Sequence, residues 1–370
     1  MYTFSDYAHR GMLLINNTLF KRRKKLSSVM LYSTDLCNSK CLHCYIWQKQ
    51  PKQSMPLSSI KKIVESSAVT KRTKIGLEGG EFLLHPEANE ILDYMTKNHP
   101  NFDLLSNCVN PSKLIDLCEK YLVLDPNKKH KFIPRLYISL DGKDSTHEKI
   151  RGVKGVYPKV IEVIEALHKK VPISVMFTLT PFNSFEDLVH VGELCKKYNV
   201  DMRVGIYNNM EYFETKETAH TGKGNTLDYK ISEIPEIVKN FEENYDFMMP
   251  YQCFRNGELK LPCLSIKDSI VIYPNGDVPL CQNKQKILGN VNNEPLEKII
   301  NKPESVKCHK DHRRCNECWV NFHRKYDIVL YRGMEKILPK KIIEMFFGKY
   351  QWNKNKNQSY SKTLKTYGKD

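Results

Sequence analysis

Between residues 29 and 206 the chain repeats two hydrophobic patterns in turn. Short runs of apolar and β-branched residues recur, and after each comes a stretch with apolar residues every three or four positions. The first pattern is typical of buried strands and the second of amphipathic helices. The runs are VMLYST (29–34), TKIGLEG (73–79), FDLLSN (102–107), RLYISLD (135–141), ISVMFTLT (173–180) and MRVGIY (202–207). Six strand–helix units in series predict an α/β fold with a parallel sheet and right-handed crossovers.

Chemically distinctive residues follow these predicted strands. Three cysteines come after the first strand and Gly-Gly-Glu after the second, while Ser-Asn, Ser-Leu-Asp-Gly and Thr180–Asn183 follow the third, fourth and fifth. In parallel α/β folds, ligands bind at the carboxyl ends of the strands. The sequence therefore predicts one site at that edge of the sheet.

The rest of the chain changes character. Residues 208–260 hold a polar loop and a predicted helix, IPEIVKNFEENY. An alternating run around Asn275-Gly276 predicts a hairpin, PLEKIINK predicts a helix, and the end of the chain predicts one helix and a fraying lysine-rich tail. The expected divisions are 1–28 (extension), 29–207 (barrel), 208–260 (linker and helix), 261–330 (cysteine-rich domain) and 331–370 (helix and basic tail).

Composition narrows the function classes. No apolar run is long enough to span a membrane and no secretory signal is present, so we expect a cytoplasmic, soluble protein. The net charge of +16 suits an anionic substrate, an anionic membrane face, nucleic acid, or simply a solvated lysine-rich surface. The lack of interleaved aromatic and basic residues argues against nucleic acid.

The 12 cysteines are not expected to form disulfides, because the cytosol keeps thiols reduced. Metal ligation and apolar packing remain. Cys118 and Cys195 lie at helical spacing among apolar residues, and we expect both in the core.

The stretch CNSKCLHCY contains Cys37, Cys41 and Cys44, and the next cysteine is Cys108. Three thiolates can hold three corners of a cubane iron–sulfur cluster and leave one iron open to a substrate or cofactor. An open coordination position is what separates catalytic metal sites from closed structural ones.

The spacing Cys37-x3-Cys41-x2-Cys44, followed by Tyr45, resembles the signature of the radical S-adenosylmethionine (SAM) superfamily. The resemblance implies a partial (βα)6 TIM-type barrel. It also implies a [4Fe–4S] cluster whose open iron chelates SAM, and one-electron cleavage of SAM to a 5′-deoxyadenosyl radical that abstracts hydrogen.

Other positions resemble the family's SAM-binding motifs, although Phe82 and Cys108 replace its usual Pro and Gly. The resemblance implies that Glu81 holds the SAM ammonium, Ser139 contacts the ribose and Arg151 pairs with the SAM carboxylate. The cofactor-binding residues expected in this way are Tyr45, Gly79, Gly80, Glu81, Asn107, Ser139, Asp141 and Arg151.

A second cysteine group, Cys263-x12-Gly276-x4-Cys281 with Cys315-x2-Cys318, resembles the SPASM/twitch extension of radical SAM enzymes. The resemblance implies a small α+β domain with one auxiliary [4Fe–4S] cluster held by these four cysteines. Cys253 and Cys308 are alternative ligands, and a structural zinc ribbon is the alternative site.

Members with this extension modify peptides or oxidise carbohydrate-like alcohols. We expect oxidation or crosslinking of a peptide or another anionic substrate, with flavodoxin or ferredoxin as electron donor. Sugar or nucleotide-linked dehydrogenation and a non-catalytic iron–sulfur or zinc protein are the alternatives. Gln282 occupies the position at which sulfatase-maturing members have an Asp that acts as a catalytic base. The candidate bases in this chain are Asp141, His147 and Tyr207.

Overall fold

The computed structural model describes residues 4–20, 25–125, 127, 129–208, 227–241 and 243–367. Residues 209–226 of the predicted polar loop and the last three residues of the lysine-rich tail lie outside this part of the chain. None of the helices it contains has the length and apolar character needed to cross a membrane.

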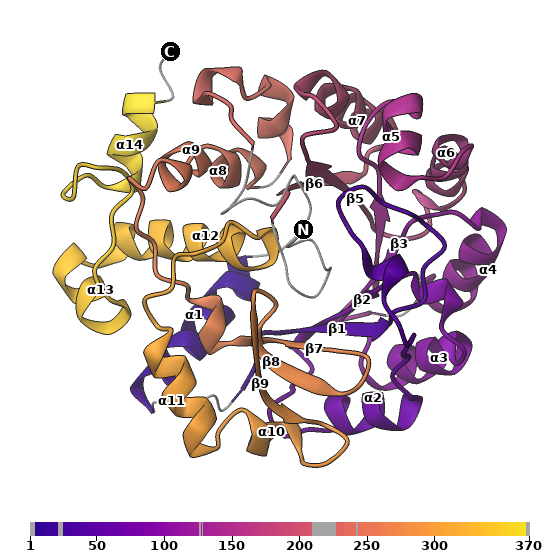
Figure 1. The fold of residues 1–370 in the computed structure, drawn as a ribbon, viewed down its shortest axis with the longest axis horizontal. Helices are drawn as coiled ribbons and strands as arrows, with labels where there is room; N and C mark the ends of the chain where they lie inside the picture. Colours follow the sequence, from indigo (N-terminus) through magenta and orange to yellow (C-terminus); the bar gives the residue numbers. More distant parts are fainter. Residues whose placement is uncertain are drawn as a thin grey trace.

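A curved parallel sheet forms the centre of the fold (Figure 1). In the described residues it has seven strands in the order β6-β5-β4-β3-β2-β1-β7. The strands are β1 (Ser28–Thr34), β2 (Lys74–Gly79), β3 (Phe102–Ser106), β4 (Arg135–Ser139), β5 (Ile173–Leu179), β6 (Asp201–Ile206) and β7 (Ser269–Ile272). All six predicted strands are present, so the partial barrel is confirmed.

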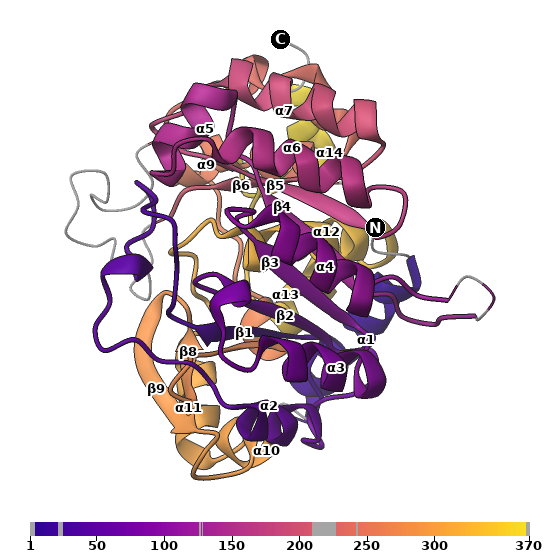
Figure 2. The same cartoon turned by 90° about the vertical axis from the view of Figure 1, so that its right-hand side faces the viewer.

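Both faces of the sheet are covered, which explains the near-continuous apolar runs of its strands. On β1, Val29 and Leu31 pack into the main core, whereas Met30 and Tyr32 point to the other face and belong to a smaller inner cluster. Helices α2 to α7 lie along the outer side of the sheet, and α1 and α12 lie opposite them (Figures 1 and 2). Cys118 on α4 and Cys195 on α7 are buried in the main core, as predicted.

The helices are α1 (Phe4–Leu19), α2 (Leu57–Val64), α3 (Ala88–Asn98), α4 (Pro111–Tyr121), α5 (Asp144–Arg151), α6 (Val156–Leu167), α7 (Phe185–Tyr198), α8 (Asn244–Met248), α9 (Tyr251–Arg255), α10 (Leu296–Ile299), α11 (Pro303–Asp311), α12 (Asn321–Ile337), α13 (Lys340–Phe347) and α14 (Tyr360–Tyr367). Local sequence sets several of their ends. Ser184 and Asp187 form a capping box at the start of α7, and α5 ends at Gly152 with a left-handed φ of 63°.

One side chain blocks the edge of the sheet at β6. Asn244, at the start of α8, accepts a hydrogen bond from Val204 N at 3.1 Å and donates to Met202 O at 2.8 Å. The amide thus pairs with the edge strand as a neighbouring strand would. In the described residues the sheet ends at β6 and does not close onto β7.

Three predictions for the C-terminal half need correction. The run predicted as one hairpin is divided, since β7 joins the barrel sheet beside β1 while β8 (Asp277–Cys281) pairs with β9 (Lys284–Asn290). The helix expected over IPEIVKNFEENY (234–245) is instead one 3-10 turn, Glu236–Asn240, followed by the start of α8 at Asn244. Beyond residue 331, α12 is followed by α13 and α14, and Trp352 and Tyr360 are buried rather than part of a frayed tail.

Candidate active site and second cysteine site

The loop that carries Cys37, Cys41 and Cys44 follows β1 and is held against the end of α5. Leu42 N donates to Ile150 O at 2.9 Å, and Lys40 N donates to Arg151 O at 3.0 Å. Gly152 is required at this junction, because a Cβ there would lie 2.6 Å from Lys40 O. The packing of α5 therefore fixes the path of the cysteine loop.

Gly79 and Gly80 bring the end of β2 against the same loop. Gly79 has a φ of +124°, and a Cβ at Gly80 would lie 2.0 Å from Leu36 O, inside any allowed contact. Gly80 N donates to Thr34 O and Glu81 N donates to Leu36 O, each at 2.7 Å. Only glycine allows this close approach of two backbones.

Glu81 ties the second strand end to the third. Its carboxylate accepts hydrogen bonds from Ser106 Oγ at 2.9 Å and Asn107 N at 2.8 Å. The Asn107 amide in turn donates to Asn38 Oδ1 and Ser39 Oγ in the cysteine loop. Glu81 thus supports the loops around the site, and its contact with the SAM ammonium, implied by the family resemblance, stays a prediction.

Arg151 lies between Asp141 and the cysteine loop. Its Nη2 is 2.6 Å from Asp141 Oδ2, and its Nη1 is 3.9 Å from Cys41 Sγ. Burial would raise the pKa of Asp141, but the Arg151 guanidinium holds that pKa below its ordinary value. Asp141 therefore positions Arg151, which is the member of the pair that faces the site.

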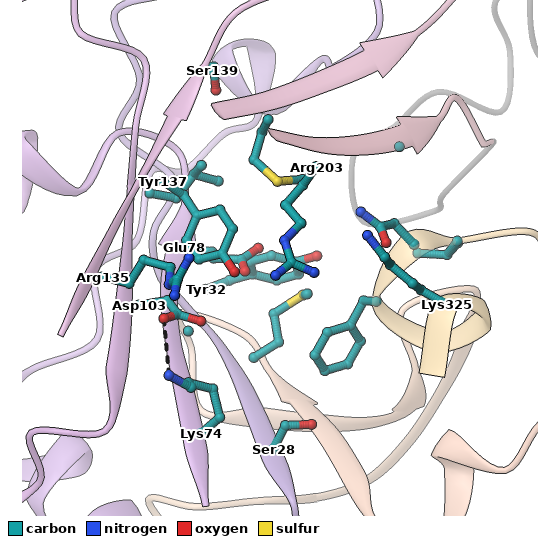
Figure 3. Close-up of a pocket in the computed structure, with 18 of the residues that line it drawn as sticks. Ser28, Tyr32, Lys74, Glu78, Asp103, Arg135, Tyr137, Ser139, Arg203 and Lys325 are labelled. Atoms are coloured by element: carbon teal, nitrogen blue, oxygen red, sulfur yellow. Dashed lines mark hydrogen bonds and ion pairs between the residues drawn. The ribbon is translucent and has the colours of Figure 1, made fainter. Parts of the chain in front are cut away.

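One cavity of about 760 Å³ joins these elements to the interior of the barrel (Figure 3). The expected site residues that line it are Cys37, Cys41, Cys44, Gly79, Gly80, Asn107, Ser139 and Arg151. Tyr45, Glu81 and Asp141 do not line it. The structure thus gathers most of the predicted site and places the other three residues behind it or beside it.

The candidate bases differ in position. Tyr207 lines the cavity, whereas Asp141 and His147 do not. Burial and the nearby Arg151 lower the pKa of His147 to about 3, and its Nδ1 accepts a hydrogen bond from Asp141 N at 3.1 Å. His147 is therefore a neutral part of the scaffold.

Sequence reasoning missed several cavity residues, among them His43, Glu78, Arg203 and Lys325. Figure 3 shows Glu78 and Arg203 reaching into the space near Tyr32, with Lys325 approaching from α12. A usable signal was the period of two along β2, which puts Lys74, Gly76 and Glu78 on the inner face.

The second cysteine group also gathers around one point. Cys263, Cys281, Cys315 and Cys318 line a small cavity of about 30 Å³ between α12 and the β8–β9 hairpin. Cys253 on α9 and Cys308 on α11 are buried and do not line it.

Arg324 on α12 is buried beside this group. Its guanidinium donates to Cys318 O at 2.8 Å, to Leu261 O and to Asn316 Oδ1 at 2.8 Å. One acceptor belongs to Cys318 itself, Leu261 lies two residues before Cys263, and Asn316 directly follows Cys315. One side chain therefore holds the segments on which three of the four cysteines lie.

Both cysteine groups fit iron–sulfur ligation. Burial raises the pKa of Cys37 to about 11 and that of Cys281 to about 12, so without metal these thiols hold their protons. Thiolate is the form that binds iron, and a positive metal centre favours it. Cys37, Cys41 and Cys44 would hold one cluster and the four later cysteines another, and such clusters supply one-electron chemistry.

Residues 31–195 match the radical SAM superfamily, and residues 263–319 match SPASM, an iron–sulfur cluster-binding domain. The chain thus contains a radical SAM domain followed by a SPASM domain. Its cofactors are accordingly SAM and [4Fe–4S] clusters, and the zinc-ribbon alternative for the second site is set aside.

The relatives of this chain differ in the roles that their names state. It is 27% identical over 278 residues to the antilisterial bacteriocin subtilosin biosynthesis protein AlbA of Bacillus subtilis, a match that covers 73% of this chain and 58% of AlbA. It is 26% identical over 322 residues to GTP 3',8-cyclase of Clostridium botulinum, covering 77% of this chain and 93% of the cyclase.

The structure of Streptococcus suis SuiB bound to precursor peptide SuiA has a TM-score of 0.57 with 13% identity, covering 81% of this chain and 70% of SuiB. At that identity the likeness shows a shared fold.

Proposed function

We propose that this protein cleaves SAM reductively at the Cys37, Cys41 and Cys44 site and uses the 5′-deoxyadenosyl radical to oxidise or crosslink a peptide. Cys263, Cys281, Cys315 and Cys318 would hold an auxiliary [4Fe–4S] cluster. Gly79, Gly80, Asn107, Ser139 and Arg151 would surround SAM, with Tyr45, Glu81 and Asp141 in support. A low-potential donor such as flavodoxin or ferredoxin would supply the electron.

The observation that carries the proposal is the position of the large cavity between the two cysteine groups. On one side it is lined by Cys37, Cys41 and Cys44. On the other side it is lined by Gln282, which follows Cys281, and by Val320, two residues after Cys318. A substrate in this space would lie beside both metal sites, as an oxidation that uses both requires.

The relatives favour a peptide as the substrate. AlbA takes part in bacteriocin biosynthesis, and the SuiB structure holds a precursor peptide. A side chain of a peptide fits a cavity of about 760 Å³, which is within the usual size of small-ligand pockets.

A nucleotide is the second candidate substrate. GTP 3',8-cyclase acts on GTP by name, and its match covers most of its own length. Lys74, Arg135, Arg203 and Lys325 line the cavity and would suit an anionic ligand.

Anaerobic reconstitution tests the proposal. We expect about two cubane clusters per chain and 5′-deoxyadenosine when the protein is reduced with SAM. Peptides encoded beside the gene should gain a crosslink or lose hydrogen, as measured by mass spectrometry, whereas GTP should remain unchanged. A colourless protein that leaves SAM intact would instead support a non-catalytic role.

A further inference from the structure

Glu78 is a carboxylate inside the barrel that the SAM-binding motifs do not use. It is the residue before Gly79 on β2, and it lines the cavity together with Tyr32 of the neighbouring β1. The Tyr32 hydroxyl donates to Gln282 Oε1 at 2.9 Å. Glu78 therefore lies beside Tyr32, the residue whose hydroxyl reaches Gln282 next to Cys281.

The Glu78 carboxylate lacks a partner within the described residues. Its backbone carbonyl accepts a hydrogen bond from Ser33 Oγ at 3.1 Å, whereas its side chain forms no hydrogen bond or ion pair with the described residues. Figure 3 shows the side chain in the cavity. Burial, together with the nearby Asp103, raises its pKa to about 7. A buried carboxylate without a counter-charge either holds a proton or receives a hydrogen-bond donor from a ligand.

Two glycines leave room beside this carboxylate. Gly76 precedes it on the same face of β2, and a Cβ there would lie 3.0 Å from Glu78 Oε1. Gly205 on β6 faces the cavity, where a Cβ would meet no atom nearer than 3.8 Å. The missing side chain at Gly76 thus leaves room for the Glu78 carboxylate, and the missing side chain at Gly205 keeps part of the cavity open to a substrate side chain.

The charge of the cavity wall limits what can bind there. Three acidic residues line it, Asp6, Glu78 and Asp103, against eight cationic ones, namely Arg10, Arg72, Lys74, Lys131, Arg135, Arg151, Arg203 and Lys325. This excess of positive charge disfavours an ammonium group beside Glu78 and favours a neutral group that becomes an anion.

We propose that Glu78 binds and deprotonates a cysteine thiol of the substrate, so that this part of the cavity is a thiol subsite. The proposal rests on the peptide-modifying function proposed above. In the step, the S–H bond breaks, the electron pair stays on sulfur and the proton joins a Glu78 carboxylate oxygen. No electron is gained or lost.

A thiol suits this base better than an alcohol or an amide. Proton transfer is efficient when donor and acceptor have similar pKa values, and a free thiol has a pKa of about 8.5. An alcohol or amide is a far weaker acid.

Binding of a small thiol tests the inference on the reconstituted, SAM-loaded protein under anaerobic conditions. The probe is N-acetyl-L-cysteine methylamide, and N-acetyl-L-serine methylamide is its matched control. Calorimetry measures affinity, and ultraviolet difference absorbance measures thiolate. We expect the cysteine probe to bind at least about tenfold more tightly and to form thiolate at neutral pH.

Three variants complete the test. Glu78→Gln should abolish thiolate formation and weaken binding about tenfold, Glu78→Asp should restore part of both, and the exposed Glu304→Gln should match the wild type. Iron content and melting temperature confirm that each variant is folded. Equal binding of the two probes, no binding of either, or the same thiolate signal in Glu78→Gln would overturn the inference.

The two proposals fail in different ways. A wild-type protein that forms no 5′-deoxyadenosine contradicts the proposed function. A protein that forms 5′-deoxyadenosine and keeps an unchanged thiolate signal in Glu78→Gln contradicts only the thiol subsite, because a thiol bound directly to iron would give that result.

Discussion

Among the glycines that the structure describes, Gly80 is the one at which an added Cβ would make the shortest contact. Its Cβ would lie 2.0 Å from Leu36 O, in the backbone that leads to Cys37. In Gly80→Ala that backbone must move, so we expect at least a tenfold loss of 5′-deoxyadenosine formation and less iron per chain. Product analysis and an iron assay measure both effects.

Gly333→Ala is the matched control for this prediction. Gly333 lies on α12, and a Cβ there would meet no atom within 4 Å. The substitution should leave iron content unchanged and stabilise the helix by about 0.5–1 kcal/mol. Full iron content in Gly80→Ala would show that the two backbones can separate without loss of the site.

The raised pKa of Glu78 predicts how stability depends on pH. Because the folded protein holds this proton up to about pH 7, while the unfolded chain releases it near pH 4.5, the folded state binds more protons between these values. The stabilisation is present below pH 4.5 and is lost as pH rises through 7. In urea unfolding, the free energy of unfolding of the wild type should fall by about 1–3 kcal/mol as pH rises from 4.5 to above 7. This fall should be absent in Glu78→Gln.

Other carboxylates also titrate in this pH range and change the stability of both proteins. The quantity to compare is therefore the difference in free energy of unfolding between wild type and Glu78→Gln. The Glu304→Gln variant, which changes an exposed charge, should follow the wild-type curve. Parallel curves for wild type and Glu78→Gln would mean that the Glu78 carboxylate is ionised in the folded protein.

Among single residues, those predicted well from sequence belong to local motifs. The spacing of Cys37, Cys41 and Cys44 needs only one loop, and that loop does line the cavity. The roles of Glu81 and Arg151 depend on neighbours from other elements, Ser106 and Asp141, which spacing alone does not reveal. Glu78 was missed because its importance comes from the absence of a counter-charge, a property of the whole cavity.

At the scale of elements, α12 is the support of the second cysteine site. Arg324→Lys would retain the charge but not the three hydrogen bonds to Cys318 O, Leu261 O and Asn316 Oδ1. We expect the free energy of unfolding to fall by about 2–4 kcal/mol and the auxiliary iron to be released faster to a chelator. Denaturant titration and chelator kinetics on the reconstituted protein measure these changes.

Arg332→Lys is a control on the same helix, because Arg332 pairs with Asp246 nearer the surface. The substitution should lower the free energy of unfolding by less than about 1 kcal/mol and leave the rate of iron release unchanged. Equal effects of the two substitutions would mean that α12 acts through general packing and not through the Arg324 hydrogen bonds.

Periodicity predicted the repeated strand–helix units well, since each unit carries its own apolar pattern and cap. It failed where an element depends on distant partners. The segment Ser269–Ile272 reads as half of a hairpin, yet it pairs with β1, more than 200 residues earlier. Lysine-rich α13 and α14 resemble a polar tail in sequence, but Tyr331, Tyr350, Trp352 and Tyr360 form a buried aromatic cluster that holds them.

At the scale of the whole molecule, the central question is whether the two cysteine groups beside one cavity have separate functions, SAM cleavage at one and substrate modification at the other. Cys41 and Arg151 line the cavity on the side of the first loop, whereas Cys281 is reached through Gln282 and its contact with Tyr32. The sites are thus close enough to serve one substrate but are built from different elements. This arrangement predicts different losses when one ligand is removed from each group.

Cys41→Ala should remove about four irons and abolish 5′-deoxyadenosine, because two thiolates cannot retain the open cluster. Cys281→Ala should remove a similar number of irons but keep much of the SAM cleavage while peptide modification stops. Iron assays, electron paramagnetic resonance and product analysis of both variants distinguish these outcomes, with the core substitution Cys195→Ala as a control that leaves both sites intact. If Cys41→Ala and Cys281→Ala lost the same activities together, the two groups would form one functional unit, and the division of labour across the cavity would be wrong.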